Sequence, residues 1–112
     1  MHSPIRQQLL DHSLQAISLV QPLLARITRR DRDLPSQLRR AMSSVSLNLA
    51  EGFGSQAGQA RLRFETARGS LCESRTALRV AVAWGHLSAA DVAAAETSLD
   101  SLGARLYALC RR

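Results

Sequence analysis

The segment from Leu87 to Leu109, LSAADVAAAETSLDSLGARLYAL, has the pattern of one complete amphipathic helix and decides the fold. Ser88 and Asp91 have the spacing of a capping box, which starts a helix, with Asp in place of the usual Glu. The apolar residues that follow alternate steps of three and four, like the a and d positions of a coiled coil. They are Val92, Ala95, Leu99, Leu102, Leu106 and Leu109. Because this seam covers one side of the helix, it predicts burial against neighbouring helices.

Three further helical segments precede this one along the chain. Apolar residues at three- and four-residue steps predict helices over Pro4–Arg29, from about Pro35 to Gly52, and from about Gln56 to Trp84. The connections between these segments are short, which favours antiparallel neighbours. The sequence therefore predicts an all-α fold, an up-down-up-down antiparallel four-helix bundle.

Residues with special backbone properties mark the expected helix boundaries. Ser3 is placed to cap the first helix ahead of Pro4, and Pro22 is expected to kink that helix because it lacks a backbone donor. The sequence Gly52-Phe53-Gly54 predicts the end of the second helix, and Gly85 predicts the end of the third.

Length and composition favour one helical domain over residues 1–112. Ala, Leu, Arg, Gln and Glu are abundant, whereas aromatic residues make up only 4%, which argues against an all-β fold. The longest apolar run, Val80–Trp84, is far shorter than the roughly 20 residues of a membrane-spanning helix. No apolar region follows Met1 as in a signal peptide. We therefore expect a cytoplasmic protein that does not enter the membrane.

No motif of a catalytic or metal centre is found in the sequence. A di-iron bundle needs Glu-x-x-His on two helices, and no glutamate here has a histidine three residues later. His2, His12 and His86 lack ligand spacing and are expected at the surface or the chain terminus. Cys72 and Cys110 lack zinc-site spacing and are expected to be buried free thiols. We therefore expect no enzymatic activity, no metal and no cofactor.

Two polar clusters are candidates for a hydrogen-bonding network or a ligand site. Asn48 and Glu51 share one face of the second predicted helix, and Ser70, Glu73 and Thr76 lie along one side of the third. We favour the interpretation that the two glutamates pair with arginines on neighbouring helices and fix the packing register. The alternative is a small-ligand site within an oligomer.

All fifteen basic residues are arginines, and the formal net charge is +6. Four of them form a stripe on the third predicted helix, at spacings of seven, seven and four: Arg61, Arg68, Arg75 and Arg79. This stripe flanks the apolar face, which is the place of e and g residues in a coiled coil. Its arginines either form ion pairs between helices or subunits, with partners such as Glu96 and Asp100, or bind phosphate. Arg39 and Arg40 are further candidates for phosphate contacts.

The positive charge is concentrated in the first three helices. Residues 1–44 carry seven arginines against three acids, residues 45–87 five against three, and residues 88–112 three against three. No alternation of basic and aromatic residues accompanies this charge, so a base-specific reader is not supported. Contact with a nucleic-acid backbone remains open.

Two motifs stand in order along the middle of the chain, and a turn follows them. The first comprises Leu38-Arg39-Arg40-Ala41, Ser44 and Asn48-Leu49-Ala50-Glu51-Gly52-Phe53-Gly54. The second comprises Ala67-Arg68-Gly69-Ser70-Leu71-Cys72-Glu73, with Thr76 and Leu78, and the turn is Trp84-Gly85-His86-Leu87. Over about residues 34–90, the chain resembles the 23S rRNA-intervening-sequence proteins, a bacterial family of small four-helix bundles. It departs from the family pattern at Ser46, where Pro is common, and at Arg61, Arg63 and Thr66, where apolar residues are common.

The resemblance implies a four-helix protomer, a ring-like homopentamer, a role in binding RNA or DNA, and no enzymatic activity. The motif positions that carry over are Asn48, Glu51, Gly52, Gly69, Ser70 and Glu73. We expect Gly69 to allow close helix contact, Gly52 to form the turn, and the two glutamates to organise the arginines.

The leading hypothesis is a non-enzymatic oligomeric bundle that binds a nucleic-acid backbone through its arginine surface. The candidate residues are Arg39, Arg40, Arg61, Arg68, Arg75 and Arg79. The alternative is a protein–protein interaction scaffold in which these arginines form salt bridges between subunits.

Overall fold

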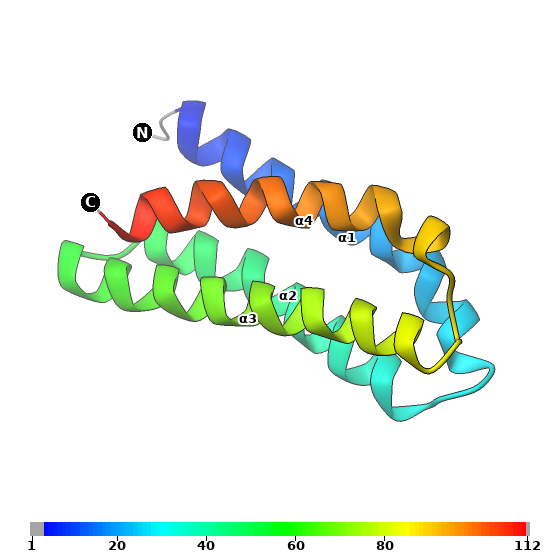
Figure 1. Ribbon diagram of the computed structural model, residues 1–112. Helices are drawn as coiled ribbons and strands as arrows, with labels where there is room; N and C mark the ends of the chain where they lie inside the picture. Colours follow the sequence, from blue (N-terminus) through cyan, green and yellow to red (C-terminus); the bar gives the residue numbers. More distant parts are fainter. Residues whose placement is uncertain (1–3, 112) are drawn as a thin grey trace.

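The computed structural model describes residues 4–111 as four antiparallel helices (Figure 1). They are α1 (Pro4–Thr28), α2 (Asp33–Phe53), α3 (Ala57–Ala83) and α4 (Ala89–Cys110). Each helix packs against its neighbour in the chain, and α1 also packs against α4, so the four close into a bundle of 43 × 22 × 21 Å. The predicted all-α bundle is confirmed. None of the four helices is long and apolar enough to cross a membrane.

The seam of α4 lies at the centre of the core. Its five residues from Val92 to Leu106 are each at most 2% exposed, and Leu109 at the end of the helix is half-buried. The largest side chains that the other helices add to the same core cluster are fully buried: Val20, Ile27, Leu38, Val45, Leu49, Leu71 and Leu78. Burial of this apolar surface is the main stabilising contribution of the bundle.

The start of α4 has the predicted capping box. Ser88 Oγ accepts a hydrogen bond from the Asp91 backbone N–H at 3.1 Å, and the Ser88 N–H donates to Asp91 Oδ2 at 2.8 Å. Arg26 at the end of α1 forms an ion pair with the same carboxylate at 3.0 Å. This guanidinium, followed by the bonds from Ser88, lowers the pKa of Asp91 from 3.8 to about 2.

The turn that joins α3 to α4 is a Schellman motif built on Gly85. Gly85 has a φ of +78°, a left-handed conformation that favours glycine. The N–H of His86 donates to the Ala81 carbonyl and the N–H of Gly85 to the Val82 carbonyl, both at 2.9 Å. The predicted C-terminal break of α3 at Gly85 is confirmed.

The predictions for α1 concern a cap at Ser3 and a kink at Pro22. Ser3, the predicted cap, lies outside the described residues. α1 continues as one helix through Pro22, which is exposed, and the kink at this position stays a prediction. At the next connection, Asp31 Oδ1 accepts hydrogen bonds from the N–H groups of Asp33 and Leu34, at 2.9 and 3.0 Å, and so caps α2.

Two glycines have roles that differ from the expectations. Gly52 lies inside α2 rather than in the turn, and a Cβ at this position would overlap with the Phe64 ring of α3. It is therefore Gly52 that allows close helix contact. Gly69 is exposed, and nothing lies within 4 Å of the position a Cβ would take, so the expected close contact at Gly69 is wrong. Gly69 faces outward because the buried face of α3 passes through Ala67, Leu71 and Ser74 instead.

Candidate nucleic-acid interface

The four arginines of the α3 stripe do not share one environment. Arg75 Nη2 lies 3.1 Å from Asp100 Oδ1, and Arg79 Nε lies 4.0 Å from Glu96 Oε1, both acids being on α4. The predicted ion pairs between helices are confirmed for these two arginines, and they form within one chain. Because exposed ion pairs contribute little to stability, their main effect is to hold the two guanidinium groups beside α4.

Arg68 of the stripe contacts an aromatic ring instead of an acid. Its Cζ atom lies 4.8 Å from the centre of the Tyr107 ring, and Arg111 Cζ lies 5.4 Å from the same centre. Arg111 Nη1 also donates to Tyr107 Oη at 3.5 Å. The sequence pattern did not indicate this arrangement, because Arg68 and Tyr107 are on different helices and nearly forty positions apart.

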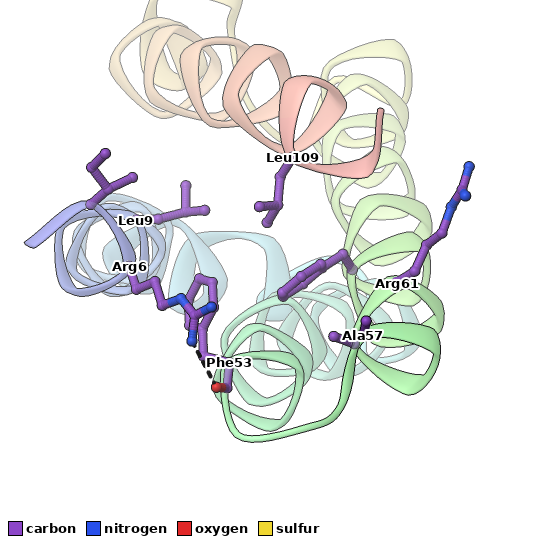
Figure 2. Close-up of a pocket in the computed structure, with 9 residues that line it drawn as sticks. Arg6, Leu9, Phe53, Ala57, Arg61 and Leu109 are labelled. Carbon is purple, nitrogen blue, oxygen red and sulfur yellow. Dashed lines mark hydrogen bonds between the residues drawn. The ribbon is translucent and has the colours of Figure 1, made fainter. Parts of the chain in front are cut away.

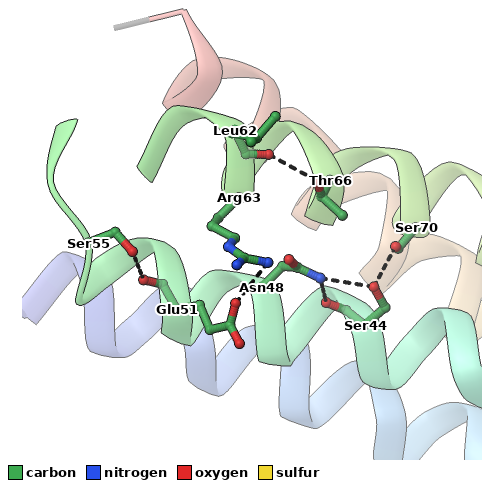
Figure 3. Close-up of polar contacts among 8 residues, drawn as sticks. All are labelled: Ser44, Asn48, Glu51, Ser55, Leu62, Arg63, Thr66 and Ser70. Carbon is green, nitrogen blue, oxygen red and sulfur yellow. Dashed lines mark hydrogen bonds and ion pairs between the residues drawn. The ribbon is translucent and has the colours of Figure 1, made fainter. Parts of the chain in front are cut away.

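The polar residues of the first motif hold α2 against α3 (Figure 3). Asn48 Nδ2 donates to the carbonyl and the hydroxyl oxygen of Ser44, at 2.9 and 3.0 Å, and Ser44 Oγ lies 2.7 Å from Ser70 Oγ. The predicted network therefore includes Asn48 and Ser70. Thr76 is outside it, since its hydroxyl donates to the Cys72 carbonyl of its own helix.

The two motif glutamates behave differently. Glu51 Oε2 lies 2.9 Å from Arg63 Nη1 of α3, which confirms the expected pairing across helices (Figure 3). Glu73 is exposed and forms no ion pair within residues 4–111, so for Glu73 the expected pairing within the chain is wrong. Glu73 lies on the outer face of α3.

Residues of this network line an open groove between α2 and α3. Arg39 and Arg40, in the first half of α2, line one end of this groove. The Glu51–Arg63 pair lines the other end, near the α2–α3 turn. The other residues that line it are Ser43, Ser44, Leu47 and Asn48. The groove therefore combines hydroxyl and amide groups with two arginines that have no acidic partner.

Arginine side chains without a partner are concentrated in one segment. Six arginines in the described part of the chain make no side-chain hydrogen bond, ion pair or ring contact: Arg29, Arg30, Arg32, Arg39, Arg40 and Arg61. Five of the six lie within residues 29–40, where Asp31 and Asp33 are the only acids. The Asp31 carboxylate is already bound to α2 backbone N–H groups and lies 3.6 Å from His86 Nε2.

The two described histidines are half-buried at the edge of the bundle, and each contacts another part of the fold. His12 is half-buried, with Nδ1 3.0 Å from Arg105 Nη1 and Nε2 3.1 Å from the Ser98 carbonyl. Because arginine can only donate, His12 Nδ1 accepts and Nε2–H donates to Ser98. The His86 side chain is 13% exposed and lies beside Asp31. His2 lies outside the described residues.

The cysteines and acids of the described chain do not gather into a site. Within residues 4–111, no group of three or more His, Cys, Asp or Glu residues is arranged to hold a metal. Cys110 is buried as predicted, and burial followed by contact with Glu65 raises the pKa of its thiol to about 11. Cys72 is exposed, so the prediction of a buried thiol is wrong there, because Cys72 lies on the outer face of α3.

An apolar pocket of about 280 Å³ opens at the end of the bundle where α2 joins α3 (Figure 2). Its wall includes Leu9, Phe64 and Leu109, and the Phe53 and Phe64 rings are 5.3 Å apart. Arg6 Nη1 donates to the Phe53 carbonyl at 3.0 Å beside this pocket, whereas the Arg61 side chain points away from it (Figure 2). The pocket presents no cluster of polar groups that would orient a small ligand.

Comparison with known proteins identifies the family of the chain. The family model described as 23S rRNA-intervening sequence protein matches residues 9–108, which include α2, α3 and most of α1 and α4. No curated protein and no solved structure matches the chain. The matched region contains both motifs, the groove between α2 and α3, and the Arg75 and Arg79 ion pairs. The chain belongs to the 23S rRNA-intervening sequence protein family.

Proposed function

We propose that this protein is a non-enzymatic helical bundle that binds the phosphate backbone of RNA or DNA. The observation that carries the proposal is the set of five arginines without partners in residues 29–40. A guanidinium without an acidic partner is free to neutralise a phosphate, and releasing counterions from the nucleic acid favours binding. Arginines already bound to an acid would first have to give up that ion pair.

Within this set, Arg39 and Arg40 are the main candidates because they also line the groove between α2 and α3. The hydroxyl and amide groups of Ser44 and Asn48 lie in the same groove and can donate to, or accept from, sugar and phosphate. Arg75 and Arg79 are weaker candidates, since each lies beside an acid of α4. The candidate residues therefore fall into two classes that an experiment can separate.

The test compares two matched double variants in binding to a structured RNA at low salt. Arg39→Gln/Arg40→Gln removes two arginines without partners, and Arg75→Gln/Arg79→Gln removes two arginines that have acidic partners. Both variants lower the net charge by two. The proposal predicts a clearly larger loss of affinity for the first variant. Equal losses, or a larger loss for the second, would contradict it.

Self-association is the second part of the proposal. Leu62 on α3 is 67% exposed, which is costly for a large apolar side chain in an isolated protomer. We propose that a second copy covers it in a homo-oligomer, with five subunits as the family resemblance implies. Native mass spectrometry gives the number of subunits, and Leu62→Ser should lower it. A monomeric wild-type protein would contradict this part.

The scaffold function, with the stripe as salt bridges between subunits, has less support. Arg75 and Arg79 already pair with Asp100 and Glu96 of their own chain. A scaffold without nucleic-acid binding predicts two results. The native mass of the oligomer changes in Arg68→Gln/Arg75→Gln, and the wild-type protein does not bind RNA.

A further inference from the structure

Tyr107 is an exposed aromatic side chain that stands between two arginines. It lies in the last turn of α4 and is 45% exposed. The Arg68 and Arg111 guanidinium groups lie 4.8 and 5.4 Å from its ring centre, within the range of cation–π contacts. Neither arginine forms an ion pair within residues 4–111. Two like charges are thus held against one ring without an acid between them.

The surroundings of the ring are also positive. Arg61, seven residues before Arg68 on α3, makes no hydrogen bond, ion pair or ring contact with a described residue, and its charge acts on Cys110. Glu65 is the acid that interacts with this end of α4, and it faces Cys110. Two arginines therefore contact an exposed ring, and an anionic group placed here would reduce the repulsion between their guanidinium groups.

We propose that Arg68, Tyr107 and Arg111 form a contact for an unpaired nucleotide, in which the base stacks on Tyr107 and the phosphate binds arginine. This inference rests on the proposed nucleic-acid function and names the form of nucleic acid, a single strand. A duplex backbone requires only charge, whereas an exposed ring between guanidinium groups offers flat surfaces that stack on bases.

One ring contact is positioned to give way to a base. Arg111 follows the last residue of α4 as its C-cap, and its Tyr107 contact is the longer of the two. Arg68 is fixed in the middle of α3, with its neighbour Ala67 fully buried. The base therefore replaces Arg111 on the ring, and the displaced guanidinium remains near enough to bind the adjoining phosphate.

This contact lies far along the bundle from Arg29, Arg30 and Arg32, which lie in and beside the α1–α2 turn. The α1–α2 turn is at one end, and the last turn of α4 is at the other (Figure 1). The bundle is 43 Å long, and a stacked strand advances about 3.4 Å per nucleotide. A strand of about six nucleotides spans about 20 Å, so it does not reach from Tyr107 to the α1–α2 turn, whereas Arg39 and Arg40 lie between the two ends. The two proposals rest on different residues, so variants at Tyr107 and at Arg39 and Arg40 test them separately.

The experiment measures binding of a short uridine strand, about six nucleotides, to the wild-type protein, Tyr107→Phe and Tyr107→Leu. Tyr107→Phe retains the ring, whereas Tyr107→Leu retains an apolar side chain without a ring. We expect Tyr107→Phe to bind as the wild type does and Tyr107→Leu to bind about 5- to 150-fold more weakly, the usual effect of losing one stacked base. Far-UV circular dichroism checks that each variant is folded.

A fluorescence signal separates stacking from a purely structural role of the ring. Tyr107 is the one tyrosine of the chain and Trp84 the one tryptophan, and Trp84 is 72% exposed. In Trp84→Phe, the emission therefore reports Tyr107 alone, and a stacked base should quench it when the uridine strand binds. A ring that only joins α3 to α4 predicts unchanged emission.

Two outcomes overturn the inference. The first leaves the proposed nucleic-acid function intact, and the second contradicts that function as well. If Tyr107→Leu binds the short strand as the wild type does while Arg39→Gln/Arg40→Gln loses affinity for structured RNA, the Tyr107 contact is wrong and the proposed function stands. If the wild-type protein binds neither probe at low salt, both fail.

Discussion

Gly52 of α2 lies so close to the Phe64 ring of α3 that no Cβ fits between them. This contact joins the two helices next to the Phe53–Phe64 ring pair, whose centres are 5.3 Å apart. The motif glycine predicted to form the turn is therefore a packing residue, and the turn itself begins after Phe53.

Substitution of this glycine should destabilise the bundle. Gly52→Ala forces the Phe64 ring or the helix backbone to move, and such overpacking costs about 1–3 kcal/mol of unfolding free energy. Gly69→Ala is the matched control from the same family motifs, because the Gly69 site is open and an exposed helical alanine gains about 0.5–1 kcal/mol over glycine. Urea denaturation of both variants measures the difference. Equal stability of the two variants would show that the Phe64 contact is unimportant.

The ion pair between Asp91 and Arg26 should make stability depend on pH in the acid range. Folding lowers the pKa of Asp91 from 3.8 to about 2, so the ionised group stabilises the folded state above pH 4. This contribution is lost as the pH falls from about 4 to 2. Asp91→Asn should therefore be less stable than wild type at neutral pH, with a difference that shrinks over this range.

Thermal unfolding at pH values from 7 to 2 measures this difference, and Arg26→Gln supplies the matched test. If the pair acts as a unit, the double variant should lose less stability than the sum of the two single variants. Additive losses would show that the Asp91 effect comes from its capping of α4 alone.

The two thiols should react at very different rates. Cys72 is exposed, whereas Cys110 is buried and its pKa is raised to about 11, so little reactive thiolate forms there at neutral pH. Titration of the native protein with a thiol reagent at pH 8 should modify one cysteine per chain. Cys72→Ser should show no fast reaction until the protein is unfolded. A fast reaction in native Cys72→Ser would contradict the burial of Cys110.

Filling the small space at Gly103 should stabilise α4. A Cβ at this position would lie 3.5 Å from Leu71 Cδ2 and 3.6 Å from Arg75 Nη1, which is ordinary van der Waals contact. Gly103→Ala should therefore raise the unfolding free energy by up to about 1 kcal/mol, the helix-propensity difference. A decrease, measured by urea denaturation, would mean that α3 and α4 approach more closely here.

The bundle and part of the candidate site could be predicted from the sequence because they depend on local patterns. The seam and capping box of α4 are set by spacings within one helix. The ion pairs of Arg75 and Arg79 were predictable because the stripe lies beside the apolar face, within reach of α4.

The orientation of α3 could not be predicted equally well. Its buried face contains Ala67, Ser74, Ala77 and Ala81, and residues as small as these also occur on exposed faces. The pattern therefore left open which way Gly69, Cys72 and Glu73 point. The contact of Arg68 with Tyr107 depends on the packing of two helices, so no spacing within one helix indicates it.

The most direct test of the account is the affinity of the wild-type protein for a structured RNA over a series of salt concentrations. Binding through arginine–phosphate contacts predicts that the logarithm of the affinity falls linearly with the logarithm of salt. Arg39→Gln/Arg40→Gln should reduce this slope by about two, because each lost phosphate contact reduces it by about one. No binding at low salt, or an affinity that does not change with salt, would contradict the account.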